Sequence, residues 1–430
     1  MSAFVPAEEL AQFAQVYARI KSMYVDEVDD AQLITDAAAG MVSSLDPHSE
    51  YLNEEDMEQM RTLTEGQFGG IGITIEIQGT VVRIVEVTPE SAASKAGIRV
   101  GDTILALDDE PLSQLKLHHA LAIMRGAPGT EIKILISRDG VSAPMHMKLT
   151  RTIIKVPSVS YRLLQTGYAY LRIAQFQENT AGELGQALDS IYEATDGALA
   201  GLVLDLRDNP GGLLTAAVAT VSAFLPRSQL VMSTIGRTKQ ANLRLTTSPE
   251  DYVTTGEPDY LALLPDRIKT VPLIVLVDGT SASAAEVVAG ALQDYARATI
   301  VGSRTFGKGS VQTLIPIGAQ AALKLTTARF YTPAGRSIQV RGVVPDIMIT
   351  CAKRDLNRLT VREADLPHHL VADAAHTKAR APMIQKSRDA DSSGNAQAVI
   401  ETGGLCPGET SKEDYALTQA MAVLLRTNKN

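Results

Sequence analysis

Cysteine and histidine are scarce in this 430-residue sequence, and where they fall excludes several kinds of catalytic centre. Both cysteines, Cys351 and Cys406, lie near the carboxyl end. They can form one disulfide in an oxidising compartment or stay as two thiols in a reducing one. A cysteine nucleophile in the middle of the chain is excluded. No histidine occurs between His146 and His368, so a Ser-His-Asp triad built in that stretch would need a histidine from elsewhere.

Long apolar runs, basic clusters and metal-ligand spacings are also missing. Without an 18-residue apolar run we expect no membrane span. The net charge of −9 and the lack of Lys/Arg-rich runs argue against a nucleic-acid surface. No HExxH or paired Cys/His spacing is present, so neither a metal nor a cofactor is expected. No export signal is visible, although a mature chain without its signal would look the same.

The chain is long enough for two or three domains, and the spacing of its apolar residues changes along its length. Apolar residues recur at helical spacing from residue 7 to about 63, which predicts two or three helices. Between them, LDPHSEYL (45–52) predicts a loop. A lone loop histidine is most often exposed, so we expect His48 to be dispensable for activity.

From Gly66 to about residue 150 short strands alternate with turn signals, which predicts a small β-rich module with a helix over 115–124. Its strands are expected at IGITIEI (71–77), VVRIVEV (81–87), DTILALDD (102–109) and EIKILISR (131–138).

From about residue 151 to 350 apolar strands alternate with helices, which predicts an α/β core. The strands are GYAYLRI (167–173), ALAGLVLDLR (198–207) and VPLIVLVD (271–278). One helix begins at Thr180, where Glu183 would complete a capping box. A terminal helix is expected within 411–427, with Ser411 and Asp414 in capping positions, and residues 386–397 resemble a flexible loop.

A serine and a lysine in the core offer a different catalytic pair. A lysine activates a serine when its amine is neutral near pH 7, and burial lowers its pKa toward that range. Lys308 lies in the loop TFGKG, and on a strand its side chain would share one face with Gln312. Ser281 and Ser283 both lie between a buried strand and a helix, where free N–H groups favour an oxyanion. The glycine turn RDNPGG (207–212) could supply a second donor.

The β-rich module resembles a PDZ domain. FGGIGI (68–73), the segment 89–112 with its AGIRVGDTI run, and RGAPGT (125–130) carry the resemblance. PDZ domains bind peptide C-termini at a sheet edge, so the resemblance implies that a C-terminus docks along 71–77. The residues it assigns to carboxylate and peptide binding are Gly69, Gly70, Ile71, Gly72 and Ile73.

The whole of residues 7 to 350 resembles the carboxyl-terminal processing peptidases. The motifs are LVLDLRDNPGGLL (202–214), DGTSASAAEVVAGALQDYARA (278–298) and GSRTFGKGSVQT (302–313). The resemblance implies a mixed α/β, crotonase-like protease core with an inserted PDZ domain and helical segments at both ends. It divides the chain into an N-terminal helical region (1–63), a PDZ domain (64–150), a serine protease core (151–350) and a C-terminal extension (351–430).

The resemblance also assigns the site. It makes Ser283 the nucleophile, Lys308 its general base and Gln312 the residue that orients the lysine, with Gly212 and Ala284 donating backbone N–H groups to the oxyanion. Ala285 departs from the serine that the family often has there, and neither member of the Ser-Lys pair is affected.

The implied activity is a serine endopeptidase that binds protein C-termini, with an adaptor protein as a possible partner. We expect a homo-oligomer in the bacterial periplasm, with Arg125 of RGAPGT as a regulatory candidate that couples the PDZ module to activity. Two alternatives stay open: a catalytically silent PDZ scaffold on a protease-like body, and a trypsin-like protease with an appended PDZ domain, which the histidine gap disfavours.

Overall fold

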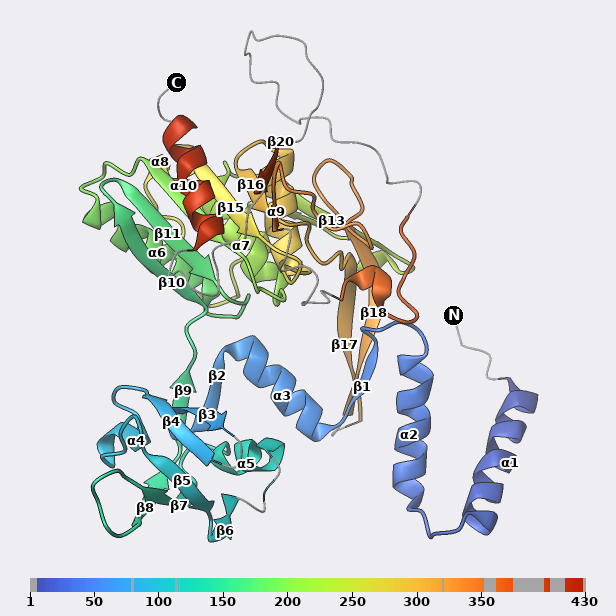
Figure 1. The fold of residues 1–430 in the computed structure, drawn as a ribbon. Coiled ribbons are helices and arrows are strands. Elements are labelled where there is room, and N and C mark those ends of the chain that lie inside the picture. Colours follow the sequence, from blue (N-terminus) through green and yellow to red (C-terminus); the bar gives the residue numbers. More distant parts are fainter. Residues whose placement is uncertain are drawn as a thin grey trace. The chain divides into compact units, whose positions relative to one another are not determined.

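A computed structural model describes residues 6–78, 81–112, 115, 117–318, 321–351, 361–373, 398–402 and 414–427 (Figure 1). The chain divides into two compact units, one made of residues 1–58, 161–176 and 185–430, the other of 59–160 and 177–184. Each unit has its own sheets and buried apolar core. Cys406, Ser411 and the 386–397 segment lie outside the described residues, as does the side chain of Cys351, so the disulfide alternatives stay open.

A seven-stranded sheet forms the centre of the larger unit, in the order β10-β11-β12-β15-β16-β19-β20. Neighbours from β11 to β20 pair in parallel. β12 and β15 are buried along their whole length, which suits their unbroken apolar sequences, because parallel sheets are covered on both faces. The strands are β10 (Val159–Gln165), β11 (Tyr168–Ile173), β12 (Gly201–Asp205), β15 (Leu273–Val277), β16 (Thr299–Gly302), β19 (Ile347–Cys351) and β20 (Ala398–Thr402).

Helices alternate with these strands, which confirms the predicted α/β core. They are α6 (Thr180–Ala194), α7 (Leu214–Phe224), α8 (Asp266–Thr270), α9 (Ala284–Asp294) and α10 (Tyr415–Thr427). Every residue of α9 is buried. The predicted terminal helix is present as α10, whose Leu417, Ala420 and Leu424 join a core cluster with Val203 and Ile274 of the sheet. Asp414 accepts the Leu417 N–H at 3.1 Å and so caps this helix, as predicted.

A second, five-stranded sheet of the same unit pairs segments from distant parts of the chain. Its order is β1-β18-β13-β14, with β17 on the other side of β18. β17 carries Gln312 on a strand, as the sequence predicts, but Lys308 lies before this strand and the register shifts between Val311 and Gln312, so the two side chains do not share one regular strand face. The elements are β1 (Glu50–Leu52), β13 (Leu230–Gly236), β14 (Arg244–Thr246), β17 (Ser310–Ile317) and β18 (Ala321–Tyr331), with short 3-10 turns η2 (Lys239–Ala241), η3 (Pro249–Asp251) and η4 (Glu363–Asp365).

The N-terminal region is helical, as its periodicity predicts, with α1 (Ala7–Met23), α2 (Asp30–Ser43) and α3 (Glu54–Glu65). None of the residues of α1 is buried, and Leu10, Phe13 and Val16 are exposed. Among the described residues, no helix combines the length and apolarity needed to cross a bilayer. The predicted loop 45–52 separates α2 from α3 and ends in the three residues of β1.

The smaller unit has a six-stranded sheet in the order β3-β4-β5-β7-β8, with β6 beside β5, and a separate β2-β9 pair. Its strands alternate buried and exposed residues, as one-sided sheets do. The elements are β2 (Gln67–Gly70), β3 (Ile73–Gln78), β4 (Val81–Val87), β5 (Thr103–Leu107), β6 (Glu110–Pro111), β7 (Glu131–Ser137), β8 (Met145–Thr150), β9 (Thr152–Lys155), α4 (Ala92–Lys95) and α5 (Leu117–Met124).

Two local predictions are wrong in instructive ways. The strand expected from Ile71 begins only at Ile73. Gly72 interrupts the extended backbone with a φ of 80°, which favours glycine, and a β-carbon there would lie 2.3 Å from the Ser91 Cβ. Helix α6 begins at Thr180 as expected, but the N–H groups that a capping box would pair have other acceptors: Thr180 N–H donates to the Gln177 carbonyl and Glu183 N–H to the Asn179 carbonyl. The carboxylate of Glu183 accepts hydrogen bonds from the backbone N–H and the hydroxyl of Ser158.

Candidate active site

Three turns that carry predicted site residues leave three neighbouring parallel strands at the same edge. β12 leads into RDNPGG, β15 into the turn with Ser283, and β16 into the loop with Lys308. Leu276 of β15 pairs with Asp205 on one side and with Val301 on the other, so the three strands end at nearly the same level. The carboxyl ends of parallel strands are where open α/β sheets place their binding sites. The fold therefore gathers these turns.

Ser283 occupies a strained turn between β15 and α9. Its φ of 53° and ψ of −114° are values that side-chain-bearing residues rarely adopt. Such strain costs about 1–3 kcal/mol and is found preferentially at functional sites. A strained strand-turn-helix serine is also the arrangement that exposes nucleophiles in hydrolases. Ser281, the other serine of the turn, is fully buried and donates its hydroxyl to the Leu206 carbonyl at 2.7 Å. Ser281 is thus structural, whereas Ser283 is only half-buried.

Two backbone N–H groups next to Ser283 are available to an anion. Ala284 is the first residue of α9, where N–H groups have no partner within the helix and the helix dipole favours negative charge. Within the part of the chain that the structure describes, neither the Ala284 nor the Gly212 N–H has a hydrogen-bond acceptor. Gly211 brings the two turns together, since a β-carbon there would lie 2.8 Å from Ser283 Cβ and 3.1 Å from Ala284 N.

The RDNPGG turn is held rigidly in this position. The buried Asn209 side chain accepts the Gly211 N–H at 2.8 Å and donates to the Ile173 carbonyl, while its backbone carbonyl accepts the Ala282 N–H at 3.0 Å. Gly212 has a φ of 136°, and a β-carbon would stand 2.0 Å from the Phe176 carbonyl oxygen. Only glycine fits at this position.

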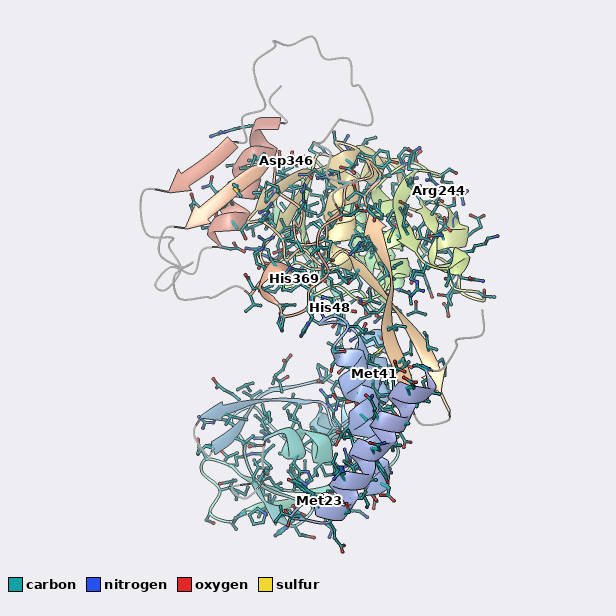
Figure 2. The ribbon with its side chains drawn as sticks, turned by 90° about the vertical axis from the view of Figure 1, so that its right-hand side faces the viewer. Met23, Met41, His48, Arg244, Asp346 and His369 are labelled. Atoms are coloured by element: carbon teal, nitrogen blue, oxygen red, sulfur yellow. The ribbon has the colours of Figure 1, made fainter. Side chains whose placement is uncertain are left out.

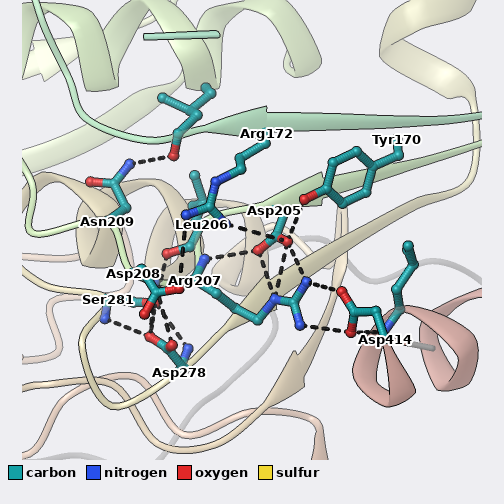
Figure 3. A network of polar contacts seen from close by, with 12 residues as sticks. Tyr170, Arg172, Asp205, Leu206, Arg207, Asp208, Asn209, Asp278, Ser281 and Asp414 are labelled. Carbon is teal, nitrogen blue, oxygen red and sulfur yellow. Dashed lines mark hydrogen bonds and ion pairs between the residues drawn. The ribbon is translucent and has the colours of Figure 1, made fainter. Parts of the chain in front are cut away.

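A charged network fixes the start of the same turn (Figure 3). Asp205, fully buried at the end of β12, accepts hydrogen bonds from the Tyr170 hydroxyl at 2.8 Å and from the Arg207 backbone and guanidinium. Arg207 also donates to both carboxylate oxygens of Asp414, just before α10. Burial would lower the pKa of Arg207, but the hydrogen bonds to Asp414 and Asp205 raise it instead. The guanidinium therefore joins the terminal helix to the turn.

Glu286 joins the serine turn to the lysine loop, a role that sequence analysis missed. Its fully buried carboxylate accepts the Ser283 N–H at 2.8 Å and the Lys308 N–H at 3.0 Å on the same oxygen, Oε2. Its Oε1 accepts the Thr305 hydroxyl at 2.6 Å and the Gly307 N–H at 2.8 Å. Because one oxygen binds both nitrogens, the backbones of Ser283 and Lys308 are neighbours. Burial raises the pKa of Glu286 to about 7, while these hydrogen bonds oppose the rise.

The Lys308 amine has the lowered basicity that a general base requires. Burial, and then the positive charge of Lys324, lower its pKa to about 8, whereas Glu363, Asp46 and Glu286 act in the opposite direction. A general base works best with a pKa near the working pH. With a pKa of about 8, roughly one amine in ten is neutral at pH 7, and this fraction rises steeply at higher pH.

The hydrogen-bond network around Gln312 fixes which way its amide points. The Asp46 carboxylate can only accept, so the Thr326 hydroxyl, 3.0 Å away, donates to it and must itself accept from Gln312 Nε2, also at 3.0 Å. Gln312 Nε2 donates its second hydrogen to the Ser310 hydroxyl at 3.0 Å. The Oε1 of Gln312 is thus the atom left to accept a hydrogen bond, which suits a protonated amine.

His48 is not the exposed loop residue that the sequence led us to expect. Its side chain is only 15% exposed, and its Nε2 lies 2.8 Å from Oε2 of the fully buried Glu363. The expectation of exposure is therefore wrong. No signal in the sequence could have shown it, because the two residues are separated by more than 300 positions.

The other predicted residues, Gly69 to Ile73 and Arg125, belong to the smaller unit. Gly69 and Gly70 lie in β2, paired with β9, and Ile73 begins β3. The Arg125 guanidinium lies over the Phe68 ring at 4.9 Å from its centre, and the neighbouring Gly126 N–H donates to the Gly69 carbonyl. The RGAPGT turn is thus in direct contact with the glycine segment.

Comparison with known families assigns three parts of the chain. Residues 167–349 match the model of peptidase family S41, residues 83–138 match the PDZ domain, and residues 2–56 match the N-terminal domain of the activating protease CtpB. The S41 match includes the turns of Gly212, Ser283 and Lys308.

Similar proteins include carboxy-terminal processing proteases from several bacteria. The chain is 44% identical over 344 residues to the carboxy-terminal-processing protease of Bartonella bacilliformis, covering 80% of this chain and 75% of that protein. It is 32% identical to the carboxy-terminal processing protease CtpA of Bacillus subtilis, covering 77% and 67%. A solved photosystem II D1 C-terminal processing protease shares 27% identity, with a TM-score of 0.43 over 80% of this chain and 93% of that one. The predicted resemblance is confirmed: this chain belongs to the carboxy-terminal processing protease family, the PDZ-containing serine peptidases of family S41.

Proposed function

We propose that the chain cleaves polypeptides through an acyl-enzyme on Ser283, with Lys308 as the general base. The observation that carries this proposal is the Glu286 carboxylate, which binds the backbones of both residues at once. The strained conformation of Ser283 and the lowered pKa of Lys308 support it further. A silent scaffold would have no need of strain or of a depressed lysine pKa.

In the proposed reaction the neutral Lys308 amine takes the proton from Ser283 Oγ as the oxygen attacks the scissile carbonyl carbon. The resulting oxyanion accepts hydrogen bonds from the N–H groups of Gly212 and Ala284, each worth about 2.7–4 kcal/mol in other enzymes. Lys308 then gives its proton to the leaving amine as the C–N bond breaks. Water, deprotonated by the same lysine, hydrolyses the acyl-enzyme and regenerates Ser283. Gln312 Oε1 accepts from the protonated amine and orients it.

We infer that the PDZ domain, residues 64–150 in our division of the chain, binds the C-terminus of a protein substrate. β3 is an edge strand of its sheet, so an extended peptide can pair with it. The segment from Gly69 to Ile73 leads directly into this strand and would bind the terminal carboxylate through its N–H groups. Residues 1–63, 151–350 and 351–430 then form the helical region, the protease core and the extension.

Arg125 is proposed to communicate peptide occupancy. Its contact with Phe68 links the RGAPGT turn to the peptide-binding segment. Substituting Arg125→Ala should change the activation of cleavage by a C-terminal peptide, while peptide-independent cleavage stays constant. Equal activation in both proteins would remove Arg125 from this role.

The location and assembly rest on the family. The similar proteins are bacterial, and from the resemblance to this family we propose a periplasmic location and an adaptor protein as a partner. The exposed apolar residues of α1, among them Leu10 and Phe13, favour a homo-oligomer. Light scattering that detected only the 45.9 kDa species would exclude it.

The test compares degradation of a loosely folded protein by the wild type, Ser283→Ala and Lys308→Ala, with mass spectrometry of the products. Lys239→Ala, an exposed lysine of the same unit, is the matched control and should retain full activity. Cleavage by the wild type and the control alone would support the Ser-Lys pair. Full activity of Lys308→Ala would refute it, and no cleavage by any variant would favour the silent scaffold or an enzyme that waits for an adaptor.

A further inference from the structure

Two segments far apart in the sequence meet beside the lysine loop. One is the loop 45–52, and the other is the segment 361–373, which contains η4 and His369 (Figure 2). They are joined by the contact between His48 Nε2 and Glu363 Oε2. Burying a carboxylate costs folding free energy unless it has hydrogen-bond partners. The burial of Glu363 against His48 therefore indicates a role for this pair in the site.

The second oxygen of Glu363 leads to the backbone beside Lys308. Glu363 Oε1 accepts from Gln339 Nε2 at 2.7 Å, and Gln339 Oε1 accepts the Gly309 N–H at 2.8 Å. Gln339 is fully buried. A β-carbon on Gly309 would lie 2.5 Å from the Gln339 backbone nitrogen, so these two segments of the backbone are in close contact. A continuous series of hydrogen bonds therefore runs from His48 to the residue that follows Lys308.

The residues before Lys308 are held by the same elements. The Glu363 N–H donates to the Phe306 carbonyl at 3.3 Å, and the Val340 N–H donates to the Gly307 carbonyl at 2.8 Å. Val340 has a φ of 67°, which is a strained value for a β-branched residue. Contacts on both sides of Lys308 thus depend on η4 and on the segment that contains Gln339 and Val340.

The loop 45–52 reaches the lysine site by a second route. Asp46, which is 4% exposed, binds Thr326, the hydroxyl partner of Gln312. The charged groups that act on Lys308 are Lys324 on β18, Glu363 on η4, Asp46 in the loop and Glu286 on α9. Two of these four belong to the segments that meet at His48.

We propose that His48 and Glu363 form a latch that positions Lys308 for proton transfer, with Gln339 as the relay to the lysine loop. The proposal rests on the function assigned above to Lys308. Both latch residues are positioning residues, because they contact neither the reacting atoms nor the substrate. His48 is thus needed to position the general base Lys308, although His48 takes no proton itself.

The test measures kcat and KM for cleavage of β-casein between about pH 6 and about pH 10. His48→Ala and Glu363→Ala each break the series of hydrogen bonds, so kcat should fall by about tenfold or more with KM unchanged, as expected for a misplaced catalytic group. His48→Gln, whose amide can donate to the carboxylate, should recover most of the loss. Combining the two Ala substitutions should cost no more than the worse single one, because both break the same series.

Glu363→Gln separates charge from geometry. The amide can still accept from Gln339 and donate toward His48, but the negative charge that raises the pKa of Lys308 is gone. The rise of activity with pH should therefore move to lower pH, with little loss of maximal rate. A purely structural role would leave the pH profile in place. His369→Ala, on the same segment but with its ring against the Leu366 carbonyl, is the control and should match the wild type.

The outcomes distinguish the latch from the proposed function. If Lys308→Ala is inactive while folded His48→Ala keeps the wild-type kcat and pH profile, the latch is wrong and the Ser-Lys assignment stands. If Lys308→Ala is active, the assignment itself fails. Should the Ala variants lose their thermal unfolding transition, Glu363→Gln and His48→Gln decide. The latch is overturned if Glu363→Gln keeps the wild-type pH midpoint and one further result is found. That result is either an inactive His48→Gln or a normal kcat for an Ala variant refolded at lower temperature.

Discussion

Ser283 offers a direct test of whether the protein stores strain at its nucleophile. Its φ of 53° and ψ of −114° correspond to the first central position of a type II′ turn, which favours glycine. Both Ser283→Ala and Ser283→Gly remove the hydroxyl and should be inactive. They differ in strain, because alanine keeps the β-carbon and glycine does not.

The difference between the two variants can be worked from the geometry. Relief of backbone strain should stabilise Ser283→Gly by about 1–3 kcal/mol. Against this, glycine loses more backbone entropy on folding, about 0.5–1 kcal/mol relative to alanine. The β-carbon also packs against Gly211, so a small contact disappears. The glycine variant should therefore be more stable than the alanine variant by about 1 kcal/mol.

Thermal and urea unfolding of the two inactive proteins, followed by circular dichroism, measures this difference without interference from self-cleavage. A gain of 1 kcal/mol corresponds to a rise in Tm of about 2–4 °C for the core. Ser222→Gly against Ser222→Ala, at a helical position of α7, is the control and should show the opposite order. If Ser283→Gly were the less stable of its pair, the turn would carry no strain and the argument from it would fall.

Three further predictions concern the lysine, the shared carboxylate and the terminal helix. Activity should rise with pH around 8 as Lys308 loses its proton. Lys324→Met should move that rise to higher pH, because the positive charge of Lys324 lowers the pKa of Lys308. A shift to lower pH in the measured profile would contradict this. In Glu286→Gln an amide N–H₂ replaces one carboxylate oxygen and faces two of the four groups that donate hydrogen bonds to Glu286. This substitution should lower kcat by about 100-fold with the secondary structure retained. Wild-type kinetics would show that the carboxylate is not needed. Leu424→Ala should cost about 2–5 kcal/mol in urea unfolding, while exposed Leu425→Ala should cost under about 1, and equal losses would mean that α10 does not pack as described.

Local sequence patterns were sufficient to predict most of the helices and strands and the positions of the site turns along the chain. The strand at 81–87 has the predicted bounds, and the apolar runs before Ser283 and RDNPGG form parallel strands. Periodicity reports such elements because burial repeats with the geometry of a strand or helix. The glycine turn RDNPGG located Gly212, and the boundary between an apolar strand and a helical pattern located the Ser283 turn.

Contacts that join distant segments could not be predicted in this way. Glu183 looked like a capping residue because its spacing from Thr180 is correct, yet its carboxylate accepts hydrogen bonds from Ser158, in the bend between β9 and β10. Glu286 looked like an ordinary residue of a helix, although it binds a loop more than 20 positions later. His48 and Glu363 had no shared pattern at all. Each is a tertiary contact that overrides a local preference, and the sequence contains no spacing that records it.

The shared carboxylate of Glu286 also limits how the enzyme can diverge. The serine turn, the Thr305 hydroxyl and the lysine loop all bind this one side chain, so a substitution at any of them alters the shape available to the others. Mutational drift should therefore replace these positions together or not at all. A laboratory library that varies the two loops independently would yield mostly inactive members, whereas one that varies them as a single module would retain activity far more often.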